Sequence, residues 1–391
     1  RLNPLSHRCA MPAPPKGGAF IFTTWQMQRR RGFSLLHTFA KVIAFHLQYA
    51  YNFIRSCRFC GGGKRGVIKY MKRKWIAALL AGCMLAALLL TGCSAAETVK
   101  RLRFGVAGEG GVYHNFGEQF AALENETSNG TIELRTTAGS AANLRLLTGE
   151  YLQLAIAQAD LAQDACNQTG IFAEEEDICG FGAVAALYTE ACQVIVRADS
   201  DIQSIEDLQG KTVSIGAEES GSEQNALQIL SAYGLNDRLV DTINLNYTDA
   251  ADQLKAGKID AIVITVGTPS PVVTELAGEC GIRLLNVDGT AAQRLLSSYN
   301  AYREVTIPAG TYPGQDADVQ TVGVKAVLLA SDSLPAKQVQ QLTELLFSNR
   351  EALEEQLGLA LDPETDAVEG VGIPFHAGAA AWYKQAGITV D

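Results

Sequence analysis

After residue 100, segments with the hydrophobic pattern of a β-strand alternate with segments that have the hydrophobic pattern of an α-helix. Short apolar or alternating runs predict strands over residues 102–106, 131–137, 152–157, 183–196 (one or two strands), 212–215, 243–245, 261–266, 282–287 and 322–330. Apolar residues three or four positions apart predict helices over 112–126, from 140, over 160–166, from 222 to about 234 and from 335 to about 357. Strands that alternate with helices in this way are typical of an α/β protein with a parallel sheet.

About 290 residues follow this pattern, which is more than one core accommodates comfortably. We therefore predict two lobes. The first comprises residues 94–193 and 323–391, and the second is the insert 194–322. Since the chain passes between the lobes twice, we expect a hinge there, with a ligand crevice at the carboxyl ends of the strands.

Residues 71–93 carry the pattern of an export signal. A basic start at 71–74 precedes an uncharged apolar run over 75–90, which is shorter than a membrane-spanning helix needs. The run ends in Leu90-Thr91-Gly92-Cys93, which resembles a bacterial lipobox. We predict a lipoprotein signal peptide over 71–92, lipid on Cys93 and a protein anchored to the outer face of the cell membrane, or in the periplasm. The alternatives are a plain membrane anchor or an ordinary signal peptide.

Residues 1–70 precede this signal, although such a signal works at a true N-terminus. Our hypothesis is that they are translated from DNA upstream of a start at Met71, or are disordered. A transit peptide is the rival interpretation, because Arg-rich segments without acids resemble one.

Charge divides the chain at the same point. Residues 1–92 contain 15 Lys and Arg and no acid, whereas residues 93–391 contain 17 Lys and Arg against 42 Asp and Glu, a net charge of −25. A domain this acidic is not expected to bind nucleic acid.

Motifs of common enzymes are incomplete. Gly108-Glu109-Gly110 is followed by Tyr113 where a dinucleotide-binding fingerprint requires a third glycine, and no Walker A or Gly-x-Ser-x-Gly pattern occurs. After Cys93 the histidines are His114 and His376, too few for a zinc site or a convincing nucleophile–base pair. We expect no enzyme activity, no metal and no cofactor. Outside the cell Cys166 and Cys179, which flank an acidic loop, either pair or stay reduced.

Three strand-to-helix junctions are rich in small residues: 108–113, 138–143 and 219–223. Each leaves backbone N–H groups open at a helix start, which favours anions by about 0.3–1 kcal/mol. Ser140, Ser220 and Ser222 add hydroxyls there. Each serine taken singly is equally well explained as a helix N-cap.

The junctions are parts of longer runs: TAGSAANLRLL at 137–147, AQAD at 157–160, SGSE at 220–223, IPAGTYPGQ at 307–315 and GIPFHAGA at 372–379. On these runs the chain from about 101 to 388 resembles the TAXI family of solute-binding proteins of TRAP transporters. The resemblance implies a two-lobed clamshell of the periplasmic-binding-protein type (type II-like). It also implies capture of a small organic acid or amino acid, such as glutamate or 2-oxoglutarate, and its delivery to TRAP membrane permease subunits. We expect a monomer.

The resemblance and the junctions together give the expected ligand-binding residues: Tyr113, Ser140, Asn143, Gln158, Tyr188, Ser220, Gly221, Ser222, Glu223 and Thr268. Arg145 and Arg197 are secondary candidates for ligand binding. Glu190 departs from the family, whose members often have proline near this position, and a carboxylate there would disfavour an anion and prefer an amino group. A binding lipoprotein that signals to a membrane partner is the alternative function.

Overall fold

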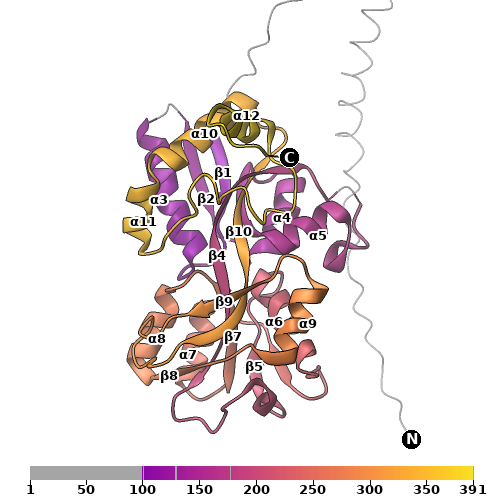
Figure 1. Cartoon of the computed structure of the whole chain (residues 1–391), viewed down its shortest axis with the longest axis vertical. Helices are drawn as coiled ribbons and strands as arrows, with labels where there is room; N and C mark the ends of the chain where they lie inside the picture. The colour runs from indigo at the N-terminus through magenta and orange to yellow at the C-terminus, as the bar shows by residue number, and fades with distance from the viewer. Residues whose placement is uncertain (1–98, 100, 128–129, 177, 391) are drawn as a thin grey trace, which may run out of the picture. The chain divides into compact units, whose positions relative to one another are not determined.

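The computed structural model describes residues 99, 101–127, 130–176 and 178–390 (Figure 1). The hypothesis for residues 1–70, the signal peptide at 71–92 and the lipidation of Cys93 concern residues outside this part of the chain. Among the described residues, no helix has both the length and the apolar character to cross a membrane. Residues 94–391 form one compact unit.

Two long antiparallel strands join the two lobes of this unit. They are β4 (Phe181–Arg197) and β10 (Val319–Ser331), and they pair from Phe181↔Ser331 to Ala191↔Gly323. A strand of 17 residues spans roughly 55 Å, which is enough to run from one lobe into the other (Figure 1). The predicted lobe boundaries, 193/194 and 322/323, fall within these strands.

Lobe 1 surrounds the first half of β4. Its further strands are β1 (Arg101–Gly105), β2 (Thr131–Arg135) and β3 (Leu154–Gln158). Its helices are α3 (Val112–Thr127), α4 (Ser140–Thr148), α5 (Ala159–Asn167), η1 (Gly170–Phe172), α10 (Ala336–Ser348), α11 (Arg350–Leu357) and α12 (Ala377–Gln385).

Lobe 2 surrounds the second half of β4. Its further strands are β5 (Thr212–Ser214), β6 (Asp241–Ile243), β7 (Ala261–Val266), β8 (Ile282–Leu285) and β9 (Arg303–Ile307). Its helices are η2 (Ile205–Leu208), α6 (Gly221–Ala232), α7 (Tyr247–Lys255), α8 (Pro271–Cys280) and α9 (Gly289–Ser298). A capping box between Ser204 and Asp207 starts η2.

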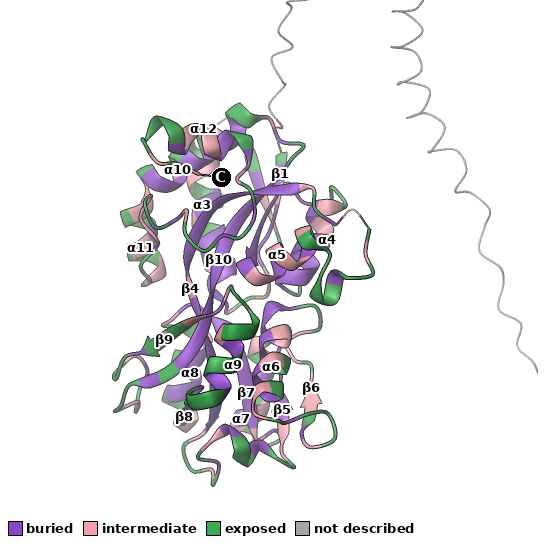
Figure 2. Ribbon diagram, turned by 45° about the vertical axis from the view of Figure 1, so that its right-hand side comes forward, coloured by how far each residue is buried: buried purple, intermediate pink, exposed green. Residues whose placement is uncertain are grey.

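The strands of the described residues make one sheet in the order β2-β1-β3-β10-β4-β7-β5-β6, with β8 paired to β4 and β9 to β10. Because side chains alternate across a strand, the buried residues of β7 serve two cores: Ile262 and Ile264 on one face, Ala261 and Val263 on the other. One large core extends along the first face through both lobes, while the second face has a separate core in each lobe. The central strands of the sheet are buried, whereas the edge strands β6 and β9 are partly exposed, and most other exposed residues lie on the helices and loops (Figure 2).

The prediction of a parallel sheet is wrong for the centre of the molecule. β1, β2 and β3 are parallel, as are β5, β6 and β7. However, β10 runs antiparallel to β3 and β4, and β4 antiparallel to β7. A chain that leaves one lobe and returns must run in opposite directions through the two crossings.

Two further element predictions need correction. The single helix expected from 335 to about 357 is α10 and α11, which meet at Asn349, where the backbone leaves the helical region and the side-chain Nδ2 donates to Leu345 O at 2.8 Å. The edge strand β9 was not predicted, because its Arg303 and Glu304 interrupt an apolar pattern and it pairs only with β10 among the described strands.

Candidate functional site

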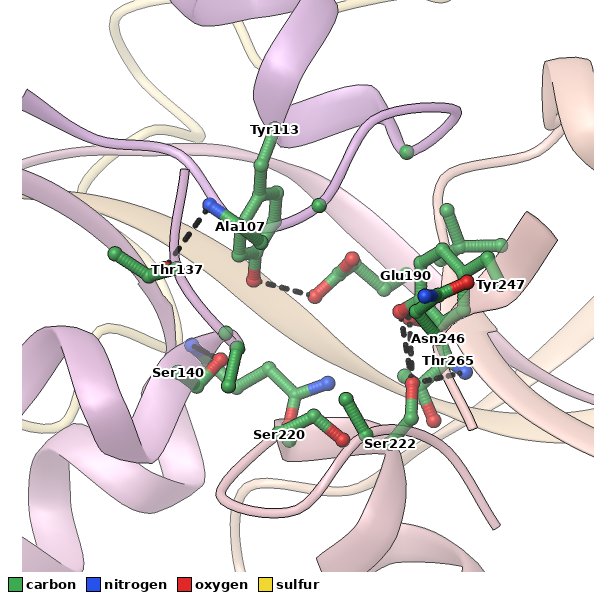
Figure 3. A pocket seen from close by; sticks show the side chains of 18 of the residues that line it. Ala107, Tyr113, Thr137, Ser140, Glu190, Ser220, Ser222, Asn246, Tyr247 and Thr265 are labelled. Carbon is green, nitrogen blue, oxygen red and sulfur yellow. Dashed lines mark hydrogen bonds between the residues drawn. The ribbon is translucent and has the colours of Figure 1, made fainter. Parts of the chain in front are cut away.

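A cavity of about 60 Å³ lies between the lobes beside β4 (Figure 3). One enclosed water needs roughly 10–15 Å³, so the cavity has room for a small polar solute. Its polar lining comes from three places. Lobe 1 contributes Tyr113, Thr137, Ser140 and Gln158, lobe 2 contributes Ser220, Ser222, Asn246, Tyr247 and Thr265, and the crossing strand contributes Glu190.

Two helices of different lobes begin at this cavity and face each other. Gly139 precedes α4 with φ 136°, and a Cβ there would lie 3.2 Å from Ser220 Cα, at the start of α6. Glycine is therefore required both by the backbone and by the close approach of the lobes. The first N–H groups of a helix have no partner within it, so both helix starts present donors to the cavity.

The serines at the N-termini of α4 and α6 make different hydrogen bonds. Ser220 is the N-cap of α6, and its Oγ accepts from Glu223 N at 3.1 Å. Ser140 lies one residue inside α4, and its Oγ accepts from Gln158 N at 3.1 Å, which holds the end of β3 against the helix. The Ser140 hydroxyl also hydrogen-bonds to the Tyr113 side chain, which connects α4 to α3.

Glu190 lies at the centre of the site. Its side chain is buried, and Tyr113 donates its hydroxyl to Glu190 Oε2 at 2.7 Å (Figure 3). Burial raises the pKa of the Glu190 carboxyl to about 8, although hydrogen bonds from Tyr113 and Gln158 partly offset this effect. Burial, with the Glu190 carboxyl next, also raises the pKa of Tyr113. The carboxyl is therefore mostly protonated at neutral pH.

A hydroxyl cluster forms the lobe 2 side of the cavity. Ser222 Oγ accepts from Thr265 N at 2.9 Å and shares a hydrogen bond of 2.9 Å with Tyr247 Oη. Tyr247 Oη also donates to Thr265 O at 3.2 Å. This cluster ties α6, α7 and β7 together, which fixes the position of the α6 start relative to the sheet.

Several polar contacts join the lobes around the cavity. Ala142 N donates to Glu219 O at 3.2 Å, and Arg145 Nη1 lies 3.0 Å from Glu219 Oε1. Beside the cavity, Asn225 Nδ2 donates to Asp160 Oδ2 at 3.0 Å. Burial raises the pKa of Asp160 to about 6. The described lobes are thus in direct contact beside the cavity.

The structure brings six of the ten predicted ligand-binding residues to the cavity wall: Tyr113, Ser140, Gln158, Ser220, Gly221 and Ser222. They come from α3, α4, β3 and α6, which lie far apart in the sequence. Whether they contact a solute stays a prediction.

The other four predicted residues are placed outside the wall. Asn143 is buried beneath it, where its Nδ2 donates to Ile156 O at 2.8 Å and its Oδ1 accepts from Thr137 at 2.7 Å. Glu223 points away and accepts from Glu219 N and Asn244 Nδ2. Tyr188 and Thr268 are also absent from the wall, and Tyr188 is buried in β4.

Sequence reasoning missed the Asn246, Tyr247 and Thr265 side of the cavity. A weak signal existed, since Asn246 directly follows the predicted strand 243–245 and asparagine is a common N-cap residue. In the structure it is the N-cap of α7, and its Oδ1 accepts from Asp249 N at 2.8 Å. Nothing in the local pattern distinguishes Thr265 from other residues of a buried strand.

Other candidate residues lie away from the cavity. Arg197 pairs with the exposed Asp199. His376 is buried, and its Nδ1 accepts from Gly378 N as the cap of α12. Cys166 and Cys179 form a disulfide, which resolves the alternative left open by the sequence. Within the described residues, no cluster of three or more His, Cys, Asp or Glu side chains is arranged to hold a metal ion.

Comparison with known proteins gives a match to the NMT1-like family over residues 104–387. The fold is similar to the alkanesulfonate-binding protein SsuA from Xanthomonas axonopodis pv. citri, with 18% identity over 68% of this chain and 81% of that one (TM-score 0.43). It is also similar to the periplasmic aliphatic sulphonate-binding protein SsuA from Escherichia coli, with 18% identity over 74% and 84% (TM-score 0.40). A third similar structure is the periplasmic binding protein BugD, with 14% identity over 74% and 99% (TM-score 0.47).

Proposed function

The chain belongs to the NMT1-like family of solute-binding proteins, and from this premise we propose that it is the extracytoplasmic solute-binding subunit of a TRAP transporter of the TAXI type. It captures a small carboxylate or amino acid between its lobes and delivers it to the membrane permease. The cavity shared by both lobes is the observation that carries this proposal.

Binding and closure are coupled in this proposal. A ligand shifts a hinge equilibrium only by its differential affinity for the two states. Here the α4 start lies on one lobe and the α6 start on the other, so a solute contacts both only when the lobes meet. A carboxylate that bridges the two starts therefore favours the closed state.

Delivery requires the protein to stay at the membrane. The proposed lipid on Cys93 provides the anchor, and residues 94–99 connect it to lobe 1, which begins with β1. A single acyl chain gives only weak membrane binding, so stable anchoring requires more than one chain.

A ligand screen tests the proposed function. The protein is melted in the presence of the common amino acids and small mono- and dicarboxylates, and a ligand at 100 times its Kd is expected to stabilise it by about 2.7 kcal/mol. A flat melting temperature across the whole panel contradicts the proposal. Uptake into vesicles that contain the TRAP permease subunits then distinguishes transport from signalling. Only a transport subunit increases the uptake of the solute that the screen identifies.

A further inference from the structure

Glu190 places a buried carboxyl group in the wall of the cavity. The side chain is 2% exposed in the described structure, and it lines the space between the lobes. A buried carboxylate is costly without a cation or several donors. Tyr113 donates to Oε2 and the Gln158 amide also donates to the carboxyl, and a fold that needed only these two bonds could use a neutral side chain.

The titratable groups that surround Glu190 are acidic or phenolic. Tyr113 faces it from α3, Asp160 from α5, Tyr188 and Cys192 from its own strand, and Tyr247 from α7. The neighbouring β10 carries Lys325, but Lys325 is opposite Thr189 in register, so it lies on the other face of the sheet, where it pairs with Asp362. Among the described residues that line the cavity there is no Lys, Arg or His.

A second hydrogen-bond acceptor is available beside Glu190. Gln158 is 2% exposed and lines the cavity, and its Oε1 has no hydrogen-bond partner within the described part of the chain. A buried unpartnered carbonyl oxygen costs about 1–3 kcal/mol. The amide nitrogen of Gln158 donates to Glu190, while Oε1 lies against the start of α6, where a Cβ on Gly221 would be 2.1 Å from it. An ammonium has three donors, so it can bind both the Glu190 carboxylate and Oε1 from within the cavity that the two residues line.

The opposite kind of chemistry is found at the helix starts. The N–H groups of the first residues of α4 (Ser140, Ala141) and of α6 (Gly221, Ser222) have no partner inside their helices. These donors favour a carboxylate. The cavity is therefore polarised, with the Glu190 carboxyl beside β4 and backbone N–H donors at the two helix starts.

We propose that the solute is a zwitterionic amino acid, whose ammonium group is held by Glu190 and Gln158 and whose carboxylate is held by the starts of α4 and α6. This inference rests on the proposed solute-binding function and names its substrate class. Glu190 is then the residue that distinguishes amino acids from organic acids of the same shape.

Proton release tests this assignment in the unmodified protein. Since Glu190 is mostly protonated at pH 7, an ammonium that ionises it displaces close to one proton (~0.9) per ligand. Calorimetry in two buffers of different ionisation enthalpy measures this number. A solute that binds with proton uptake, or with no change, overturns the assignment.

Matched ligands and a variant provide the second test. We expect glycine, L-alanine or another common amino acid to bind, and its hydroxy or keto acid counterpart (glycolate, L-lactate, 2-oxoglutarate for L-glutamate) to bind at least about 100-fold more weakly. Glu190→Gln is expected to remove most of this preference. Glu355→Gln, at an exposed site on α11, is the matched control and is expected to keep it.

The outcomes separate the two proposals. If organic acids bind and amino acids do not, the substrate class is wrong and the solute-binding function stands. If neither class binds, the proposed function itself fails. If Glu190→Gln does not fold, proton release and the ligand pairs in the unmodified protein still decide the question.

Discussion

Gly221 shows how closely the two lobes are fitted at one residue. It is the first residue of α6, and a Cβ there would lie 2.1 Å from Gln158 Oε1, on the opposite lobe. We expect Gly221→Ala to displace the Gln158 amide and to weaken ligand binding at least about tenfold. The free energy of unfolding should change by less than about 1 kcal/mol, because alanine is favourable in a helix.

Titration calorimetry and urea unfolding measure the two quantities for Gly221→Ala. Gly278→Ala in α8 is the matched control, because a Cβ there meets nothing within 4 Å. Equal ligand affinities in the two variants would mean that the Gln158 side chain can move aside without loss of binding. Its position would then not depend on the contact with Gly221.

Asn143, a predicted ligand-binding residue, is buried and makes several hydrogen bonds beneath the cavity wall. Its side-chain amide joins Gly105 O, Ile156 O and the hydroxyl of Thr137, so it connects α4 to β1 and β3. Asn143→Ala leaves buried carbonyl groups without a partner, and we expect it to lower the free energy of unfolding by about 2–4 kcal/mol. Urea unfolding measures the loss, and the exposed Asn236→Ala should cost far less.

At the scale of elements, α4 carries a contact that holds the lobes together. Arg145 lies 2.7 Å from Glu175 in lobe 1 and 3.0 Å from Glu219 in lobe 2, and its guanidinium stacks 5.0 Å from the Phe172 ring. All three charges are partly exposed, so the contact between lobes is worth about 0.2–1 kcal/mol.

We therefore expect Arg145→Ala to speed ligand release by up to about fivefold, measured by stopped-flow fluorescence. Arg135→Ala is the control, because the pair between Arg135 and Glu133 lies within lobe 1. An identical release rate in both variants would show that Arg145 does not contribute to closure.

The Cys166–Cys179 disulfide closes a loop that carries Glu175. For a separation of 13 residues, loop-closure entropy predicts about 2–3 kcal/mol of stability. Replacing both cysteines by serine should remove this amount in urea unfolding, and a reductant should have the same effect on the unmodified protein. Cys280→Ser, at a free cysteine, should respond to reductant as the unmodified protein does.

For the whole molecule, the buried acids set the dependence of stability on pH. Carboxyl groups of an unfolded chain titrate near pH 4, whereas Glu190 and Asp160 have folded pKa values of about 8 and about 6. The folded state therefore binds more protons between these limits. Stability is highest at the acid end of this window and falls as pH rises from about 4 to 8.

Urea unfolding between pH 5 and pH 8.5 measures this fall, which we expect to reach a few kcal/mol without ligand. Glu190→Gln should flatten most of it above pH 6, because its amide does not titrate. If the free energy of unfolding of Glu190→Gln still falls with pH above pH 6, another group is responsible for the effect.

Much of the architecture can be predicted from the sequence. The buried run of β7 matches its prediction residue for residue, and α3 and α5 are predicted to within one or two residues, because the apolar period is a local property. The glycine and serine junctions also identify the helix starts at which the cavity lies. Each of these signals depends only on neighbours along the chain.

Other features depend on contacts between distant segments. The antiparallel course of β4 and β10 follows from the passage between lobes, which no local pattern encodes. The polarity of the site was likewise decided by folding, which buried Glu190 beside Tyr113, set Gln158 against Gly221 and added Tyr247 from lobe 2. A side chain acquires its pKa and its partners from the groups packed around it, so the sequence determined where the donors are and only the tertiary structure decided what they face.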